Sequence, residues 1–166
     1  MAAKSWYNKT AIPNILLFTK RKLQRRAPAM NLYDVLTSNA AKRNFLLGLI
    51  RVAKADGKVN SEEYAYFTSF GLHIGLDQDA VDEISWWWGK SQKPQISFET
   101  RREALYFIRE AIQLCHVDQK YTESEQREIY AIAEELGIEK AAVEPIEAWV
   151  AEGMDWNARG DALLEL

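Results

Sequence analysis

The sequence predicts an all-α protein in which two pseudo-symmetric three-helix repeats pack as a single helical bundle. Apolar residues recur at helical spacing in several stretches, and no stretch shows the alternating pattern of a half-buried strand. Residues 45–87 also align with residues 107–149 at a constant offset of 62, without a gap. A three-helix unit of this length cannot bury its apolar faces alone, so we expect the two copies to pack together.

The two copies are identical at ten of 43 aligned positions, and these positions coincide with expected turns, caps and core residues. The identical pairs are Phe45 and Phe107, Ile50 and Ile112, Asp56 and Asp118, Lys58 and Lys120, Glu63 and Glu125, Gly75 and Gly137, Ala80 and Ala142, Val81 and Val143, Ile84 and Ile146, and Trp87 and Trp149. Each copy is therefore expected to form a helix, an acidic turn, a helix, a glycine turn and a helix.

In the first repeat, the spacing of apolar residues predicts a helix from about Asn39 to Lys54. Asn60 is expected to cap the second helix, with Glu63 three residues later completing a capping box. Gly75 then supplies a turn because glycine adopts positive φ without steric cost. Asp77 is expected to start the third helix.

In the second repeat, Ser97 is expected to cap a helix that ends near His116. Thr122 and Glu125 repeat the capping-box pattern at the start of the next helix. Pro145 is expected to begin a new turn or to kink the last helix, because proline lacks a backbone N–H.

Charge divides the chain of 166 residues into a basic N-terminal arm, residues 1–30, and an acidic helical domain, residues 31–166. The arm carries seven basic residues and no acid, which leaves 14 basic and 24 acidic residues, a net charge of −10, in the rest. An acidic body argues against nucleic-acid binding, which requires a basic face. The basic cluster of the arm comprises Lys20, Arg21, Lys22, Arg25 and Arg26.

The arm has two interpretations that the sequence leaves open. Its apolar piece, residues 15–18, with cationic flanks suits an anionic membrane surface or an acidic partner protein. The same piece could instead pack on the acidic body. No apolar run is long enough to span a membrane or to form a signal peptide, and one cysteine, Cys115, suits a reducing compartment. We expect a cytoplasmic protein, with peripheral membrane contact as an alternative; the oligomeric state stays open.

Three consecutive tryptophans, Trp86, Trp87 and Trp88, lie about 100° apart around a helix, so one buried face cannot hide them all. Trp87 pairs with Trp149 in the repeat and is expected in the core. Trp86 or Trp88 should be partly exposed, where a large aromatic side chain can anchor a partner. Alternatively, the basic arm or the C-terminal segment covers them.

The acidic turns hold the strongest chemical signal, because Asp56 and Glu63 recur as Asp118 and Glu125. A standard EF-hand is excluded, since an apolar residue and a cation stand where the loop needs oxygen ligands at positions 1 and 3. A carboxylate-bridged dimetal site needs paired Glu-x-x-His motifs, which the chain lacks. No nucleophile–base pair, phosphate loop or cofactor fingerprint is present either, so we expect a protein that is not an enzyme.

The pattern Ala-x-Ala-Asp-Gly-x-Val-x-x-x-Glu, which begins at Ala53 and recurs in degenerate form in the second repeat, resembles the TerB family of tellurite-resistance proteins. It is also similar to the helical domain of a membrane-tethered DnaJ-type co-chaperone. The resemblance covers residues 33–152 and departs from the pattern at Gln119, where glycine is expected.

The resemblance implies an acidic all-helical domain that is linked to stress responses, has no established catalysis and is suggested to bind metal ions. The matching metal-site residues are Asp56, Glu63, Asp118 and Glu125. If the two turns converge, four carboxylates would need a divalent cation, of unspecified identity, or raised pKa values to relieve their repulsion. The alternative is that both glutamates only complete capping boxes. In that case, the protein would be an interaction or adaptor module with structural turns.

Overall fold

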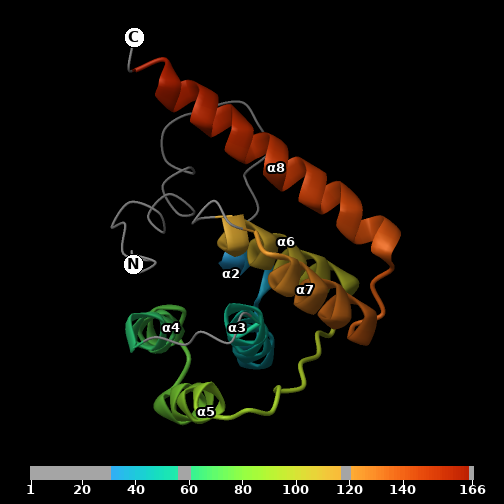
Figure 1. Ribbon diagram of the computed structural model, residues 1–166. Helices are drawn as coiled ribbons and strands as arrows, with labels where there is room; N and C mark the ends of the chain where they lie inside the picture. Colours follow the sequence, from blue (N-terminus) through green and yellow to red (C-terminus); the bar gives the residue numbers. More distant parts are fainter. Residues whose placement is uncertain (1–30, 56–60, 117–120, 165–166) are drawn as a thin grey trace.

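A computed structural model describes residues 31–55, 61–116 and 121–164, without the side chains of residues 61–63, and confirms the all-α prediction (Figure 1). Within these residues the chain forms helices joined by turns and loops, and no strand. The helices are α2 (Leu32–Val35), α3 (Asn39–Ala53), α4 (Ser61–His73), α5 (Gln78–Trp88), α6 (Arg101–His116), α7 (Glu123–Glu135) and α8 (Lys140–Ala162).

The helix bounds repeat along the chain with the offset that the sequence predicts. Helices α3, α4 and α5 begin at residues 39, 61 and 78, and α6, α7 and α8 begin at residues 101, 123 and 140. Both predicted glycine turns are present, because Gly75 and Gly137 have positive φ values of 85° and 68°. After each glycine, the next backbone N–H donates to the carbonyl five residues back, at 3.1 Å after Gly75 and 2.8 Å after Gly137. These hydrogen bonds satisfy carbonyls that a helix end leaves unpaired.

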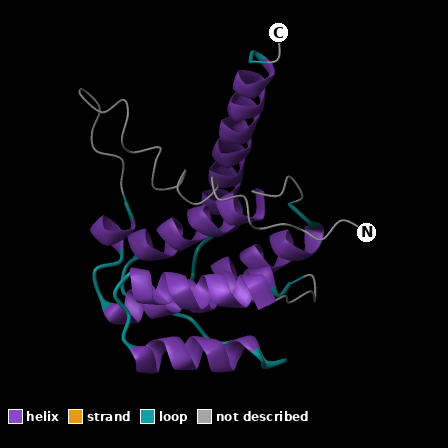
Figure 2. Cartoon of the chain, turned by 90° about the vertical axis from the view of Figure 1, so that its left-hand side faces the viewer, coloured by secondary structure: helices purple, strands orange, loops and turns teal. Residues whose placement is uncertain are grey.

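The contacts between the helices repeat only in part. Helix α3 contacts α4, α5, α6 and α7, while α6 contacts α2, α3, α7 and α8. An exact two-fold arrangement would pair α6 with α4 as it pairs α3 with α7, yet the described parts of α4 and α6 do not touch. Helix α8 also continues to Ala162, beyond residue 150 where the equivalent of α5 ends, and its C-terminal half rises clear of the other helices (Figure 2).

The core forms where α3 crosses α6. The rings of Phe45 and Phe107, which occupy equivalent positions in the two repeats, meet edge to face with centroids 6.1 Å apart. Phe98, from the segment before α6, stacks on Phe107 with ring centroids 5.7 Å apart. Gly48 lies directly against the Phe107 ring. Burial of these aromatic side chains joins the two halves of the chain into one core.

Two of the expected helix caps are confirmed and one is wrong. Asp77 accepts a hydrogen bond from the N–H of Ala80 at 2.9 Å, and Thr122 forms the expected capping box. Ser97 does not cap α6. That role belongs to Thr100, whose Oγ1 accepts from the N–H of Glu103 at 3.2 Å while the Glu103 carboxylate accepts from the N–H of Thr100.

One of the two outcomes expected at Pro145 is excluded. Helix α8 begins at Lys140 and runs through Pro145, so the proline does not start a separate turn. Trp149 is exposed, and its neighbour Val150 enters the core. In the first repeat Trp87 is half-buried. In both repeats the buried residue is thus the one after the aligned tryptophan, which is Trp88 in α5 and Val150 in α8.

Candidate functional site

Of the four acidic residues expected to bind metal, the structure describes the side chain of Glu125 alone. Asp56, Asp118 and the side chain of Glu63 lie outside the described residues. Glu125 is buried, and its Oε2 accepts hydrogen bonds from the backbone N–H and Oγ1 of Thr122, both at 2.8 Å. The expected capping role of Glu125 is confirmed.

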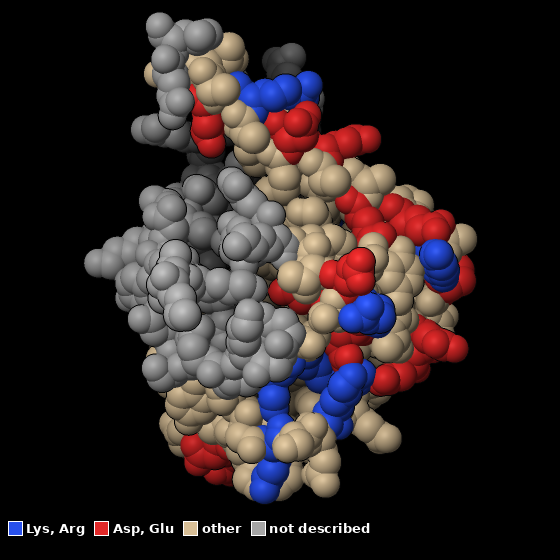
Figure 3. Space-filling view, viewed as in Figure 1, with Lys and Arg blue, Asp and Glu red and all other residues tan. Residues whose placement is uncertain are grey.

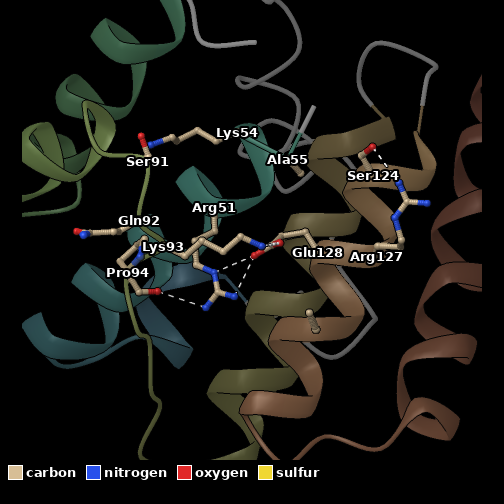
Figure 4. Close-up of a pocket in the computed structure, with 11 residues that line it drawn as sticks. Arg51, Lys54, Ala55, Ser91, Gln92, Lys93, Pro94, Ser124, Arg127 and Glu128 are labelled. Atoms are coloured by element: carbon tan, nitrogen blue, oxygen red, sulfur yellow. Dashed lines mark hydrogen bonds and ion pairs between the residues drawn. The ribbon is translucent and has the colours of Figure 1, made fainter. Parts of the chain in front are cut away.

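The two acidic turns are connected to helices that meet at one pocket of about 420 Å³ (Figure 4). Ala55, the last described residue before the first turn, lines this pocket together with Lys54. Ser124, four residues after the second turn's undescribed segment 117–120, lines the same pocket from α7. The end of α3 precedes the first turn, and the start of α7 follows the second turn. These two helix ends line the same pocket.

Among the side chains that line the pocket, four are basic (Arg51, Lys54, Lys93 and Arg127) and one is acidic (Glu128). Arg51 is only 4% exposed, and its guanidinium donates to Glu128 at 3.0 Å and to Glu135 at 2.6 Å. Lys93 forms a second ion pair with Glu128. The basic side chains are thus bound by carboxylates from α7, which ties α3 and the loop before α6 to that helix.

The electrostatics of Arg51 keep it charged despite its burial. Burial lowers the pKa of Arg51, but hydrogen bonds and charge interactions with Glu135 and Glu128 outweigh it and hold the pKa above its ordinary value. The same guanidinium also donates to the carbonyl oxygen of Pro94 at 3.3 Å. This site was not among those predicted from the sequence. A signal for it was present, since a lone arginine interrupts the apolar C-terminal half of α3.

Lys54 closes the other side of the pocket. Its Nζ donates to the carbonyl oxygens of Trp87 at 3.2 Å and Trp88 at 3.0 Å, at the end of α5. A cation at a helix C-terminus stabilises carbonyls that lack a partner in the helix. Burial lowers the pKa of Lys54. This residue therefore fixes the end of α3, just before the first acidic turn, against the end of α5.

The two tryptophans expected at an interaction surface differ in exposure. Trp86 is 52% exposed, and Lys90 Nζ lies 4.3 Å from the centre of its ring. Trp88 is only 8% exposed and packs against Phe67 at 5.3 Å between ring centroids, so it is a core residue rather than a surface anchor. The basic cluster, residues 20–26, lies outside the described residues.

A carboxylate on α8 accepts hydrogen bonds from Tyr121, which follows the second acidic turn, and from two side chains of α7. Glu147 accepts from the hydroxyl groups of Tyr121 at 2.6 Å and Tyr130 at 2.7 Å, and from Gln126 at 3.2 Å. Burial raises the pKa of Glu147, but these three hydrogen bonds outweigh it, so the pKa lies below its ordinary value. Since Tyr121 directly follows the undescribed segment, Glu147 anchors the end of that turn to α8.

We predict that Glu147→Gln destabilises the protein by about 1 kcal/mol at neutral pH, because two tyrosine hydroxyls lose an ionised acceptor. A carboxylate whose pKa is lowered by folding stabilises the folded state above its unfolded pKa, and this contribution disappears as pH falls through the folded pKa. Urea unfolding should therefore show that the gap between wild type and variant narrows from pH ~7 to pH ~3. Glu144→Gln, one turn away and exposed, is the control, and a gap independent of pH would contradict this account.

On the face shown in Figure 3, α7 and α8 carry many carboxylates, and Lys and Arg side chains lie among them. No three His, Cys, Asp or Glu side chains within the described ranges are placed to hold a metal ion together. None of the helices in those ranges combines the length and the apolar character needed to cross a bilayer.

Over the described residues, the chain is all-helical, its helix bounds repeat once along the sequence, and Ala55 and Ser124 line one pocket. Comparison with protein-family models, curated proteins and solved structures finds no match to this chain.

Proposed function

We propose that the chain is a TerB-like protein of the tellurite or general stress response, not an enzyme, that binds a divalent metal ion between its paired acidic turns. In this proposal the two three-helix repeats are related by pseudo-symmetry, and Asp56, Glu63, Asp118 and Glu125 are the ligands. The observation that carries it is the shared pocket, because Ala55 and Ser124, which flank the two turns, line the same cavity.

In this proposal the two turns converge, and their convergence favours metal binding on electrostatic grounds. One Asp–Glu pair supplies too few oxygen ligands to hold Ca²⁺ or Mg²⁺ firmly, whereas two pairs supply four carboxylates. These carboxylates repel one another unless a cation lies between them. Since Oε2 of Glu125 already caps α7, Glu125 would contact the metal through Oε1. The carboxylates of this site would also face the cations that line the pocket, which favours weak rather than tight binding.

We expect Ca²⁺, Mg²⁺, Mn²⁺ or Zn²⁺ to raise the melting temperature of the native protein, since a ligand that binds the folded state alone stabilises it. At a free metal concentration about 100 times the dissociation constant, the gain is about 2.7 kcal/mol. Asp56→Asn with Asp118→Asn should abolish it.

The matched control is Asp79→Asn with Asp161→Asn, which removes the same number of aspartate charges from two exposed positions. This variant should respond to metal as the wild type does. A double turn variant that keeps the full response would remove the metal proposal.

The second candidate function is an interaction module in which the acidic turns are structural. The exposed ring of Trp86, with Lys90 above it, favours this function, because partly exposed tryptophans often anchor protein partners. The basic arm would then contact an anionic membrane surface or an acidic protein. The metal titration separates the two candidates, since an interaction module predicts no response in any of the variants.

A further inference from the structure

From Trp149 to the cap residue Leu163, α8 carries an apolar face that no described part of the chain covers. Trp149, Trp156 and Leu163 are 55%, 61% and 69% exposed. They lie seven residues apart, so they fall on one side of the helix. Figure 2 shows the C-terminal half of α8 standing away from the other helices. Large exposed aromatic side chains in one row are unusual on a monomeric protein and indicate a contact surface.

Two glycines alternate with these large side chains. Gly153 and Gly160 follow Trp149 and Trp156 by four residues, and no atom of the described residues lies within 4 Å of a Cβ built at either glycine. Glycine inside a helix is unfavourable compared with alanine. Gly48 has a reason within the fold, because the Phe107 ring lies 2.5 Å from its Cβ position. Gly153 and Gly160 have no such reason there, and the close approach of another helix would supply one.

We infer that two copies of this chain pair through this face, which we call the Trp–Gly face: Trp149, Gly153, Trp156, Gly160 and Leu163. Antiparallel pairing places Trp156 of one copy over Gly153 of the other, and Trp149 over Gly160. Each bulky ring then fills the space above a residue without a side chain, as knobs fill holes between packed helices. Parallel pairing would instead set tryptophan against tryptophan and glycine against glycine, which leaves gaps beside the glycines.

The charges beside the Trp–Gly face favour the same partner and the same direction. Glu152 and Arg159 lie seven residues apart on one flank of the face. In the antiparallel register, Arg159 of each copy lies next to Glu152 of the other, so two ion pairs form by symmetry. Within one copy, Arg159 pairs at 3.2 Å with Asp155, and both side chains are well exposed. The basic arm of the same chain is a poorer occupant, because it has no acid to meet Arg159.

Sedimentation velocity of the full-length chain tests this inference. With increasing concentration, the mass should rise from 19.1 kDa toward twice that value. Trp156→Ala should raise the dimer dissociation constant at least about tenfold, because it removes a central aromatic anchor. Glu152→Arg should weaken the dimer, since it sets arginine against arginine. Glu152→Arg combined with Arg159→Glu should restore the dimer to within about threefold of wild type, because the ion pairs re-form with reversed direction.

Gly160→Ala provides a variant whose folding is not in doubt. It should raise the melting temperature at low protein concentration, since alanine favours helix. It should also weaken the dimer, since the added methyl group meets the partner's tryptophan.

A chain that stays monomeric at about 500 µM would overturn the inference, because a specific dimer is populated at that concentration. A dimer that is insensitive to Trp156→Ala would also overturn it. So would a double charge reversal that binds no better than Glu152→Arg, since that result would assign the acidic flank to a basic partner such as the arm.

Discussion

Arg51→Met is expected to destabilise the protein by about 3 kcal/mol, because it leaves Glu128 as a buried carboxylate that has lost its main partner. Both side chains are almost fully buried, and the guanidinium and carboxylate lie 2.9 Å apart. The loss of folding free energy should lie at the lower end of the range for broken buried ion pairs, because Lys93 also pairs with Glu128. Urea unfolding measured by circular dichroism at neutral pH checks the value.

Two further variants show whether the loss of stability comes from the unpaired buried charge or from lost side-chain packing. Arg51→Met with Glu128→Met removes both charges and should recover part of the loss, because a buried pair replaced by apolar residues often costs little. Arg127→Met breaks the exposed pair with Glu123 on the same pocket and should change stability by less than about 0.5 kcal/mol. A loss below about 1 kcal/mol for Arg51→Met would show that the Arg51–Glu128 pair does not hold α3 to α7.

Gly48→Ala is expected to destabilise the protein by about 2 kcal/mol. The new Cβ would lie 2.5 and 2.6 Å from two ring carbons of Phe107 and 3.0 Å from a methyl group of Ile96. Phe107 is fully buried and its ring contacts those of Phe45 and Phe98, which restricts its movement. Overpacking of about 1–3 kcal/mol then exceeds the gain of up to about 1 kcal/mol from replacing glycine in a helix. Thermal and urea unfolding measure the difference.

A double-mutant cycle with Phe107→Leu identifies the cause. Leucine lacks the two ring carbons that Gly48→Ala would meet, so the two substitutions together should cost at least about 1 kcal/mol less than the sum of the single variants. Additive effects would mean that Gly48 is present for a reason other than the α3–α6 contact.

The local plan of the fold could be predicted because it depends on residues close together in the chain. Helical spacing, the caps at Asp77 and Thr122, and the turns at Gly75 and Gly137 all act within a few residues. The cap of α6 was placed wrongly because several polar residues precede that helix. The repeat itself indicates the correct one, since Thr100 is equivalent to Ser38, which caps α3.

Features that depend on packing between distant segments could not be predicted. The exposure of Trp149 depends on where α8 leaves the body, which apolar spacing does not show. The pocket around Arg51 depends on α3 lying against α7, so neither Glu128 nor Glu135 could be chosen as its partner from the sequence. Of the candidate metal site, the sequence predicted the cap made by Glu125, while the ligand roles of Asp56 and Asp118 stay predictions.

Amide line broadening by Mn²⁺ tests most directly whether one metal ion lies between the two acidic turns. If it does, the amide signals of Ala55 and Ser124 should broaden together at the same low Mn²⁺ concentration, while that of Gly160, near the free end of α8, stays sharp. Asp118→Asn should then reduce the broadening at Ala55, on the far side of the pocket. Broadening at one turn alone, or at neither, would contradict a shared metal site.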